Sequence, residues 1–112
     1  MELAQVRKMA LSLPETTEEP HFNYSSFRVG GKIFATVPPE GGHIHVFVGE
    51  EQRERALALD PSFIEKLWWG KRVAGLRVAL KEAKPATVQT LLSQAWSGKA
   101  SQRLLALRGE AG

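Results

Sequence analysis

Two histidines stand two positions apart in the run from residue 43 to 49, where His43, His45 and Phe47 alternate with three aliphatic residues. Side chains two apart on a strand point the same way, so both imidazoles would share a face and could hold one metal ion. Zinc sites normally use three or four protein ligands, and no cysteine or suitably spaced carboxylate completes such a set. We therefore predict no metal site, and we keep His43 and His45 as candidates for a face that binds a ligand or a partner.

A second group that could do chemistry is His21, which follows the carboxylates of Glu15, Glu18 and Glu19. An acid–base pair is conceivable there, but carboxylates in a loop are usually solvated. The sequence has no Gly-x-Ser-x-Gly elbow, phosphate-binding Walker loop or dinucleotide fingerprint, and it has no cysteine. We predict that the protein is not an enzyme and needs no cofactor. An enzyme centred on His21 remains the least favoured alternative.

Two indoles lie beside two cations in the run Leu-Trp-Trp-Gly-Lys-Arg, residues 67–72. Lysine and arginine bind phosphates whatever the base sequence, and aromatic rings stack on bases. We therefore predict that Trp69, Lys71 and Arg72 contact nucleic acid. We expect Trp68 to cap the core instead.

The elements that must position these residues can be read from hydrophobic spacing and turn signals. Leu3, Val6, Ala10 and Leu13 predict a helix that Pro14 ends, and residues 15–20 read as an acidic loop. The remaining expected elements are strands on either side of Gly30–Gly31, a strand at 43–48, a helix at 50–59, a short helix at 61–68, a strand at 73–80, and helices at 85–97 and 101–108.

The hairpin at Gly30–Gly31 decides which side chains share a face. A two-residue turn would pair Val29 with Lys32 and mix polar with apolar residues on both faces. A three-residue loop over 30–32 pairs Val29 with Ile33, which gives one clean apolar face, so we predict that loop with a bulge. The opposite face of all the strands then carries Arg28, Phe34, Thr36, His43, His45, Phe47 and Arg77.

The expected fold is an α+β two-layer sandwich with helices on one face of a four-stranded, mostly antiparallel sheet, in the order α-β-β-β-α-β-α-α. The length of 112 residues predicts a single domain over 1–112. Fifteen Lys+Arg against twelve Asp+Glu give a formal charge of +3, a mild bias that permits an anionic partner without requiring one.

No stretch of about 18 uninterrupted apolar residues is present, so we expect neither a membrane span nor a membrane partner. The first residues, MELAQVRKMALSLPE, lack the basic start and apolar run of a signal peptide. We predict a cytoplasmic protein.

Several segments together resemble the YjbR/MmcQ-like family of small bacterial proteins. They are Leu13–Pro14, the acidic loop up to Pro20, His21–Phe22, and the hairpin Phe-Arg-Val-Gly-Gly-Lys-Ile-Phe-Ala at 27–35. One departure is visible, because the family often has a Ser-Tyr pair where this sequence has Ala95–Trp96. The resemblance implies a fold similar to the frataxin-like (CyaY-like) sandwich and to the double-wing DNA-binding module, and family members are commonly labelled DNA-binding on that likeness.

The combined prediction is a domain that binds DNA or RNA without strong sequence preference. The phosphate-binding candidates are Arg28, Lys32, Lys71, Arg72 and Arg77, and the rings are Phe34, Phe47 and Trp69. The alternative is a module that binds a protein or a small ligand on the same face. A further alternative is that helices or a second protomer cover that face, and the chain is expected to be a monomer or a homodimer.

Overall fold

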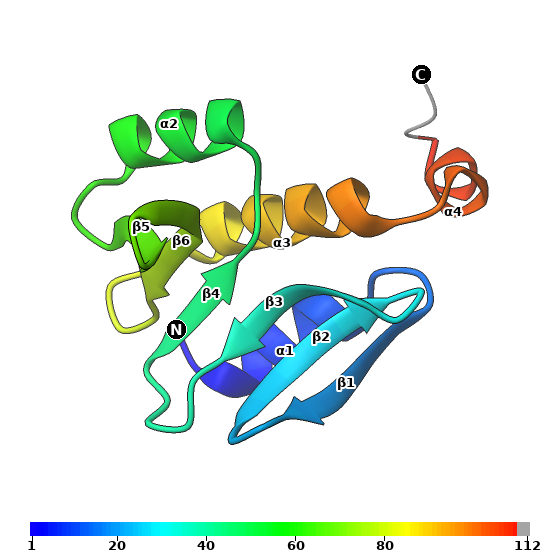
Figure 1. The fold of residues 1–112 in the computed structure, drawn as a ribbon, viewed down its shortest axis with the longest axis horizontal. Helices are drawn as coiled ribbons and strands as arrows, with labels where there is room; N and C mark the ends of the chain where they lie inside the picture. The colour runs from blue at the N-terminus through cyan, green and yellow to red at the C-terminus, as the bar shows by residue number, and fades with distance from the viewer. Residues whose placement is uncertain (110–112) are drawn as a thin grey trace.

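The computed structural model describes residues 1–109, which form four helices and six strands. The helices are α1 (Leu3–Leu11), α2 (Glu50–Leu59), α3 (Pro85–Lys99) and α4 (Gln102–Leu107). The strands are β1 (Thr16–His21), β2 (Tyr24–Val29), β3 (Lys32–Val37), β4 (His43–Val46), β5 (Ile64–Trp69) and β6 (Arg72–Ala79). Their arrangement is shown in Figure 1.

The strands form one antiparallel sheet in the order β1-β2-β3-β4-β6-β5, so β1 and β5 are its two edges. Helix α3 packs on β2, β3 and β4, and α1 packs on α3 and β1. Figure 1 shows α1 behind β2 and β3. The predicted α+β class is confirmed, but the four-stranded sheet and the order α-β-β-β-α-β-α-α are wrong, because each edge strand lies in a segment that we expected to be something else.

The first unexpected strand is β1, in the segment predicted to be an acidic loop. Its sequence has no apolar alternation. It forms a strand because its backbone pairs with β2, its one neighbour in the sheet. Charged residues and proline are typical of edge strands, where they prevent pairing with another chain. Glu18 is held here by Arg7, at 3.0 Å, and by the hydroxyl of Ser25.

The second unexpected strand is β5, where the Asp60–Pro61 pair predicted a short helix. The structure has only a turn, in which the amide of Phe63 donates to the carbonyl of Asp60 at 3.5 Å. Ile64 then pairs with Val78 of β6. Isoleucine and tryptophan favour strands, and pairing with β6 overrides the local helix-start signal.

The β2–β3 hairpin combines the two registers considered for it. Val29 pairs with Lys32 across a two-residue Gly30–Gly31 turn, and both glycines have positive φ, +58° and +77°. Beyond a bulge, Phe27 pairs with Ala35 as predicted. The predicted Val29–Ile33 pair is therefore wrong, because the extra residue sits within β3 and not in the turn.

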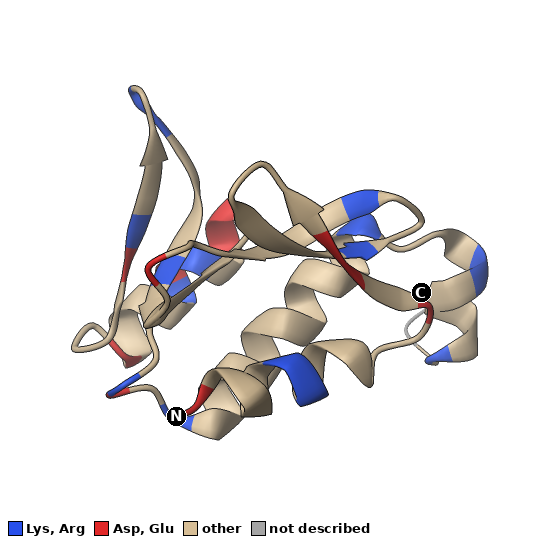
Figure 2. Cartoon of the chain, turned by 90° about the horizontal axis from the view of Figure 1, so that it is seen from below, with Lys and Arg blue, Asp and Glu red and all other residues tan. Residues whose placement is uncertain are grey.

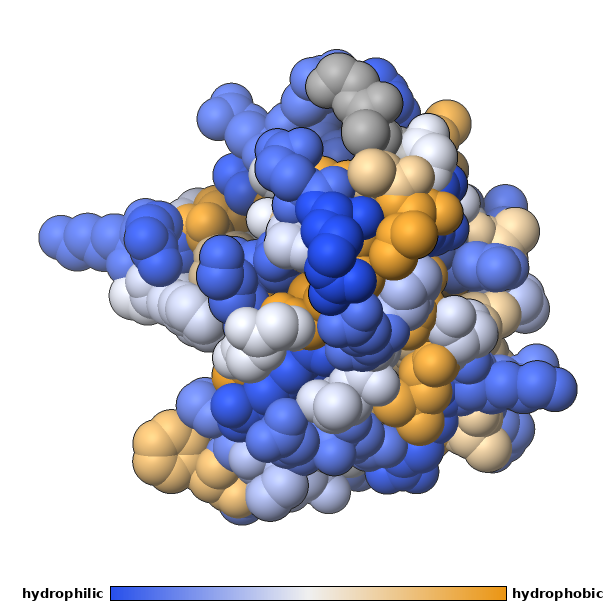
Figure 3. Space-filling view, turned by 90° about the vertical axis from the view of Figure 1, so that its right-hand side faces the viewer, coloured by the Kyte–Doolittle hydropathy of each residue, from blue (hydrophilic) through white to orange (hydrophobic). Residues whose placement is uncertain are grey.

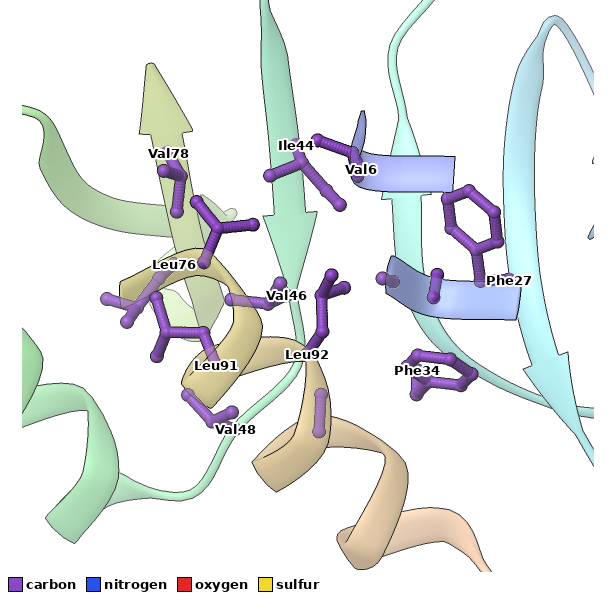
Figure 4. Close-up of a cluster of buried hydrophobic side chains, with 14 of the residues drawn as sticks. Val6, Phe27, Phe34, Ile44, Val46, Val48, Leu76, Val78, Leu91 and Leu92 are labelled. Carbon is purple, nitrogen blue, oxygen red and sulfur yellow. The ribbon is translucent and has the colours of Figure 1, made fainter. Parts of the chain in front are cut away.

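The core lies between the sheet and helices α1 and α3 (Figure 4). Alternate residues of β4 and β6 supply Ile44, Val46, Leu76 and Val78 to it, as the sequence predicts. From α3, the fully buried Trp96 donates its indole N–H to the carbonyl of Pro14 at 3.0 Å. The helix-covered face of the sheet is thus buried in the core.

The side of the molecule that bears α4 is mostly hydrophilic, with apolar residues in separate patches (Figure 3). Single exposed apolar residues such as Leu107 are normal on protein surfaces. Within residues 1–109, none of the helices has both the length and the apolar character that a membrane span requires.

Candidate functional site

A cavity of about 570 Å³ lies on the sheet face away from α1 and α3, which we call the open face. The edge strands contribute side chains to its lining from both sides. Its rings are Phe22, Tyr24, Phe47, Trp68 and Trp69, and its cations are Arg72, Arg77 and Lys99. None of the described lining residues is Asp or Glu. The cavity is therefore aromatic and positively charged.

One wall of the cavity is the β5–β6 hairpin, which stands away from the rest of the sheet and carries cations at its tip (Figure 2). Trp68 and Trp69 close β5, and each is a little over half exposed, at 56% and 55%. The ring centroids of Trp69 and Phe47 are 5.4 Å apart, within the range of favourable aromatic pairs. This contact joins the hairpin to the end of β4.

Gly75 permits the close approach of β4 and β6 at this point. A Cβ atom on Gly75 would collide with the backbone carbonyl oxygen of Val46 and would lie 3.2 Å from the ring of Phe47. Glycine is therefore the residue that allows Phe47 to sit over β6. The amide of Phe47 donates to the carbonyl of Phe34 at 3.1 Å, which fixes its backbone.

Arg77 organises the polar side of the cavity. Its Nη1 donates to Nε2 of His45 at 3.3 Å and its Nη2 donates to Nδ1 of His43 at 3.4 Å, because a guanidinium has no acceptor. Its Nε lies 3.5 Å from a carboxylate oxygen of Glu65. The Arg77 cation lies where a metal shared by the two histidines would otherwise approach them.

His45 is almost completely buried, with 4% of its surface exposed. Burial, and then the charges of Arg77 and His43, lower the pKa of its imidazole from 6.5 to about 4, against a small opposing effect of Glu40. The imidazole is therefore neutral at pH 7. That neutral form is also the one that accepts the hydrogen bond from Arg77.

Two of the lining cations are available to a ligand. Arg72, at the start of β6, and Lys99, in the last turn of α3, form no ion pair with any residue in 1–109. Lys71 lies beside Arg72 in the β5–β6 turn and is also exposed and unpaired within the described chain. These cations are free to neutralise an anion at the cavity.

Five of the ten predicted site residues line the cavity: His45, Phe47, Trp69, Arg72 and Arg77. His43 reaches it only through Arg77. Lys32, at the Gly30–Gly31 turn, and Lys71 are exposed outside the lining. Arg28 also lies outside it, since its guanidinium donates to the hydroxyl of Ser26 and to the carbonyl of Pro20.

The prediction that Phe34 lies on the open face is wrong. Phe34 is fully buried in the core, where Figure 4 shows it on the same side of the sheet as Leu92. The two-residue turn is the cause, because it places Ile33 opposite Arg28, one residue out of the predicted alternation; the extra residue at Phe34 restores the predicted facing from Ala35 onwards. Ile33 takes the place on the open face, whereas Thr36 lies there as predicted.

The expectation that Trp68 caps the core is also wrong, because its side chain is exposed and lines the cavity. A second register shift, between Leu67 and Trp68, changes the facing of residues at the end of β5. The sequence reasoning also missed Phe22, Tyr24 and Lys99. The available signal was the aromatic run from His21 to Tyr24, which could have been read as a hairpin turn.

The alternative of an enzyme centred on His21 depends on carboxylates near that ring, and the described ones have other partners. The carboxylate of Glu18 is bound by Arg7, and that of Glu15 is bound by Arg103 at 2.9 Å. The His21 ring packs edge-on against Phe22. Among residues 1–109 no three His, Cys, Asp or Glu side chains come together in a way that could hold a metal ion.

Two further hollows lie on the helices, of about 220 Å³ between α2 and α3 and about 430 Å³ beside α1 and α3. Thr90 and Gln94 line both of them, with Arg55 and Asp60 in the first and Arg108 in the second. Neither has an aromatic lining residue among those described. The cavity on the open face is the one that combines rings with cations.

The sequence matches the model of the YjbR family over residues 11–97. The fold is similar to that of the crystal structure of Deinococcus radiodurans protein DR2400, which carries a DUF419 family-model domain. The TM-score is 0.72 at 17% sequence identity, with 84% of this chain and 75% of that chain covered, so this likeness concerns the fold alone. None of the curated proteins matches the sequence. Because the family model spans most of its length, the chain belongs to the YjbR family.

Proposed function

We propose that this protein binds nucleic acid through the cavity on its open face, without strong sequence preference and without bond chemistry. The observation that carries the proposal is the lining itself, which combines five rings and three cations with no carboxylate among its described members. Phosphates would be held by Arg72, Lys99 and the neighbouring Lys71. Bases would stack on Trp69 and Phe47, and each stack contributes about 1–3 kcal/mol.

The geometry divides the predicted phosphate contacts into three groups. Arg72 and Lys71 project from the tip of the β5–β6 hairpin and have no carboxylate partner among residues 1–109. Arg77 is instead tied to Glu65 and to both histidines, so it serves chiefly to hold the cavity in shape. Arg28 and Lys32 lie outside the cavity: Arg28 could contact a strand that continues along the open face, whereas Lys32, opposite the buried Val29, lies at the hairpin tip.

A second candidate is a small aromatic anion, such as a free nucleotide. The volume of about 570 Å³ favours it, because pockets for small ligands usually measure about 300–1,000 Å³. A nucleotide would use the same rings and cations. A competition experiment separates the two functions. If the site is for a nucleotide, a free nucleotide should displace a bound oligonucleotide when the two supply equal concentrations of bases.

The proposal predicts a defined salt dependence. The affinity for a labelled oligonucleotide of about ten nucleotides, measured by fluorescence anisotropy, should fall as salt rises. Arg72→Gln removes one phosphate contact, so we expect the slope of log K against log salt to become shallower by about 0.7 for a single strand.

The matched control is Arg55→Gln, which changes the net charge equally but lies on α2, where Arg55 pairs with Glu51. It should leave both the affinity and the slope unchanged. A slope near zero in the wild-type protein, or equal effects of Arg72→Gln and Arg55→Gln, would show that this site does not bind phosphates.

A further inference from the structure

Phe22 occupies an unfavourable backbone position in the β1–β2 turn. His21 pairs with Tyr24, so Phe22 and Asn23 form a two-residue turn. The φ angle of Phe22 is +58°, in the left-handed region that favours glycine or asparagine and that a bulky side chain rarely adopts. Its neighbour Asn23 is one of the residues that tolerate this region well. The phenylalanine therefore costs the turn stability.

The fold obtains no compensating burial from this side chain. Phe22 is 91% exposed, the highest exposure of any large apolar residue described. Its ring contact is with His21, at 4.9 Å between centroids and edge-on. Strained residues persist at positions where function requires them, so an exposed ring in a strained turn indicates a binding role.

The position of the ring shows what it would bind. Phe22 lines the cavity from the side of edge strand β1, and Trp68 and Trp69 line it from the opposite edge strand, β5. The cavity thus has aromatic side chains on both flanks, with Arg72 nearby to attract a phosphate. A flat ring that enters between them can stack, whereas bases in a duplex already stack on one another and expose only their edges.

We propose that Phe22 is a ligand-contacting ring that stacks on an unpaired base in the cavity, so that the protein prefers single-stranded nucleic acid to a duplex of the same sequence. This inference rests on the proposed function. It assigns the strain at residue 22 to binding, and it means that removal of the ring should improve the stability of the fold while it weakens binding.

The test compares wild-type protein with Phe22→Asn and Phe22→Tyr. Asparagine accepts the positive φ and lacks the ring, whereas tyrosine keeps the ring and the strain. Phe22→Asn should raise the melting temperature by about 4 °C and weaken binding to a labelled single strand about ten-fold. Phe22→Tyr should bind within about two-fold of wild type. Wild type should bind the single strand about ten-fold more tightly than the duplex at equal salt.

Each other result has a distinct meaning. If wild type binds the strand and Phe22→Asn binds it equally well, or if wild type prefers the duplex, the inference is overturned and the proposed function stands. A lower melting temperature for Phe22→Asn also overturns it, because the turn would then not be strained. If wild type binds neither form of DNA, the proposed function fails and the inference fails with it.

Discussion

Replacement of Phe34 by alanine is expected to lower the free energy of unfolding by about 4 kcal/mol, because it removes a fully buried ring and leaves a cavity in the core. The free energy of unfolding of a natural domain is roughly 5–15 kcal/mol, so this loss is a large part of the total. Chemical denaturation measures it directly. Binding of nucleic acid by the protein that remains folded should be unchanged, since Phe34 faces away from the open face.

The matched variant is Phe47→Ala, which removes the same atoms from a half-buried ring on the open face. It should cost less than half as much stability and should weaken binding, because the ring that contacts Trp69 is lost. If Phe34→Ala does not fold, Phe34→Leu keeps the comparison possible, with an expected loss of about 1–2 kcal/mol. Weaker binding by either Phe34 variant, with little loss of stability, would place that ring on the open face and contradict the structure.

The stability of the protein is expected to fall by about 3 kcal/mol as the pH drops from 6.5 to 4, because of His45 alone. The pKa of its imidazole is lowered from 6.5 to about 4 in the folded protein, chiefly by burial and by the charge of Arg77. Between these values the unfolded chain binds a proton and the folded chain does not, so acid favours unfolding. The stabilisation that neutral His45 gives the fold is present above pH 6.5. Of the free energy of unfolding, about 2 kcal/mol is lost between pH 7 and pH 5.

The variant His45→Gln isolates this effect. Glutamine does not titrate, and its carbonyl oxygen can still accept the hydrogen bond that Arg77 donates to His45. Denaturation at a series of pH values should show a steeper loss in wild type than in His45→Gln between pH 6.5 and 4. Parallel curves for the two proteins would mean that His45 protonates as readily in the folded state as in the unfolded chain.

The helix-covered half of the fold could be predicted because its residues obey simple periods. Ile44, Val46, Leu76 and Val78 alternate with polar residues and are all buried. The two edge strands could not be predicted in this way, since β1 has no buried apolar side chain and β5 follows the helix-start signals of Asp60–Pro61. Both strands form because a neighbouring strand provides partners for their backbone hydrogen bonds. The residue pattern of a single segment does not reveal that neighbour.

The candidate site was predictable where the strands are regular and not where they bulge. Phe47 and Arg77 reach the open face as expected, because β4 and β6 keep their alternation there. Phe34 took the opposite side from that predicted, since β3 bulges there, and Trp68 is exposed because its segment is a strand with a register shift and not the predicted short helix. Phe22 was missed for a different reason, because its exposure depends on a turn between strands of which one was not foreseen.

The most direct measurement uses the indole N–H signals of the three tryptophans in a ¹H–¹⁵N NMR titration with DNA, as a single strand and, in a second sample, as a duplex. Trp68 and Trp69 line the cavity, whereas Trp96 is buried with its N–H bonded to Pro14 and provides an internal control. We predict that the Trp68 and Trp69 signals shift and saturate while the Trp96 signal stays in place. Binding that leaves the Trp68 and Trp69 signals unmoved, or no binding to either form, would contradict a nucleic-acid site on the open face.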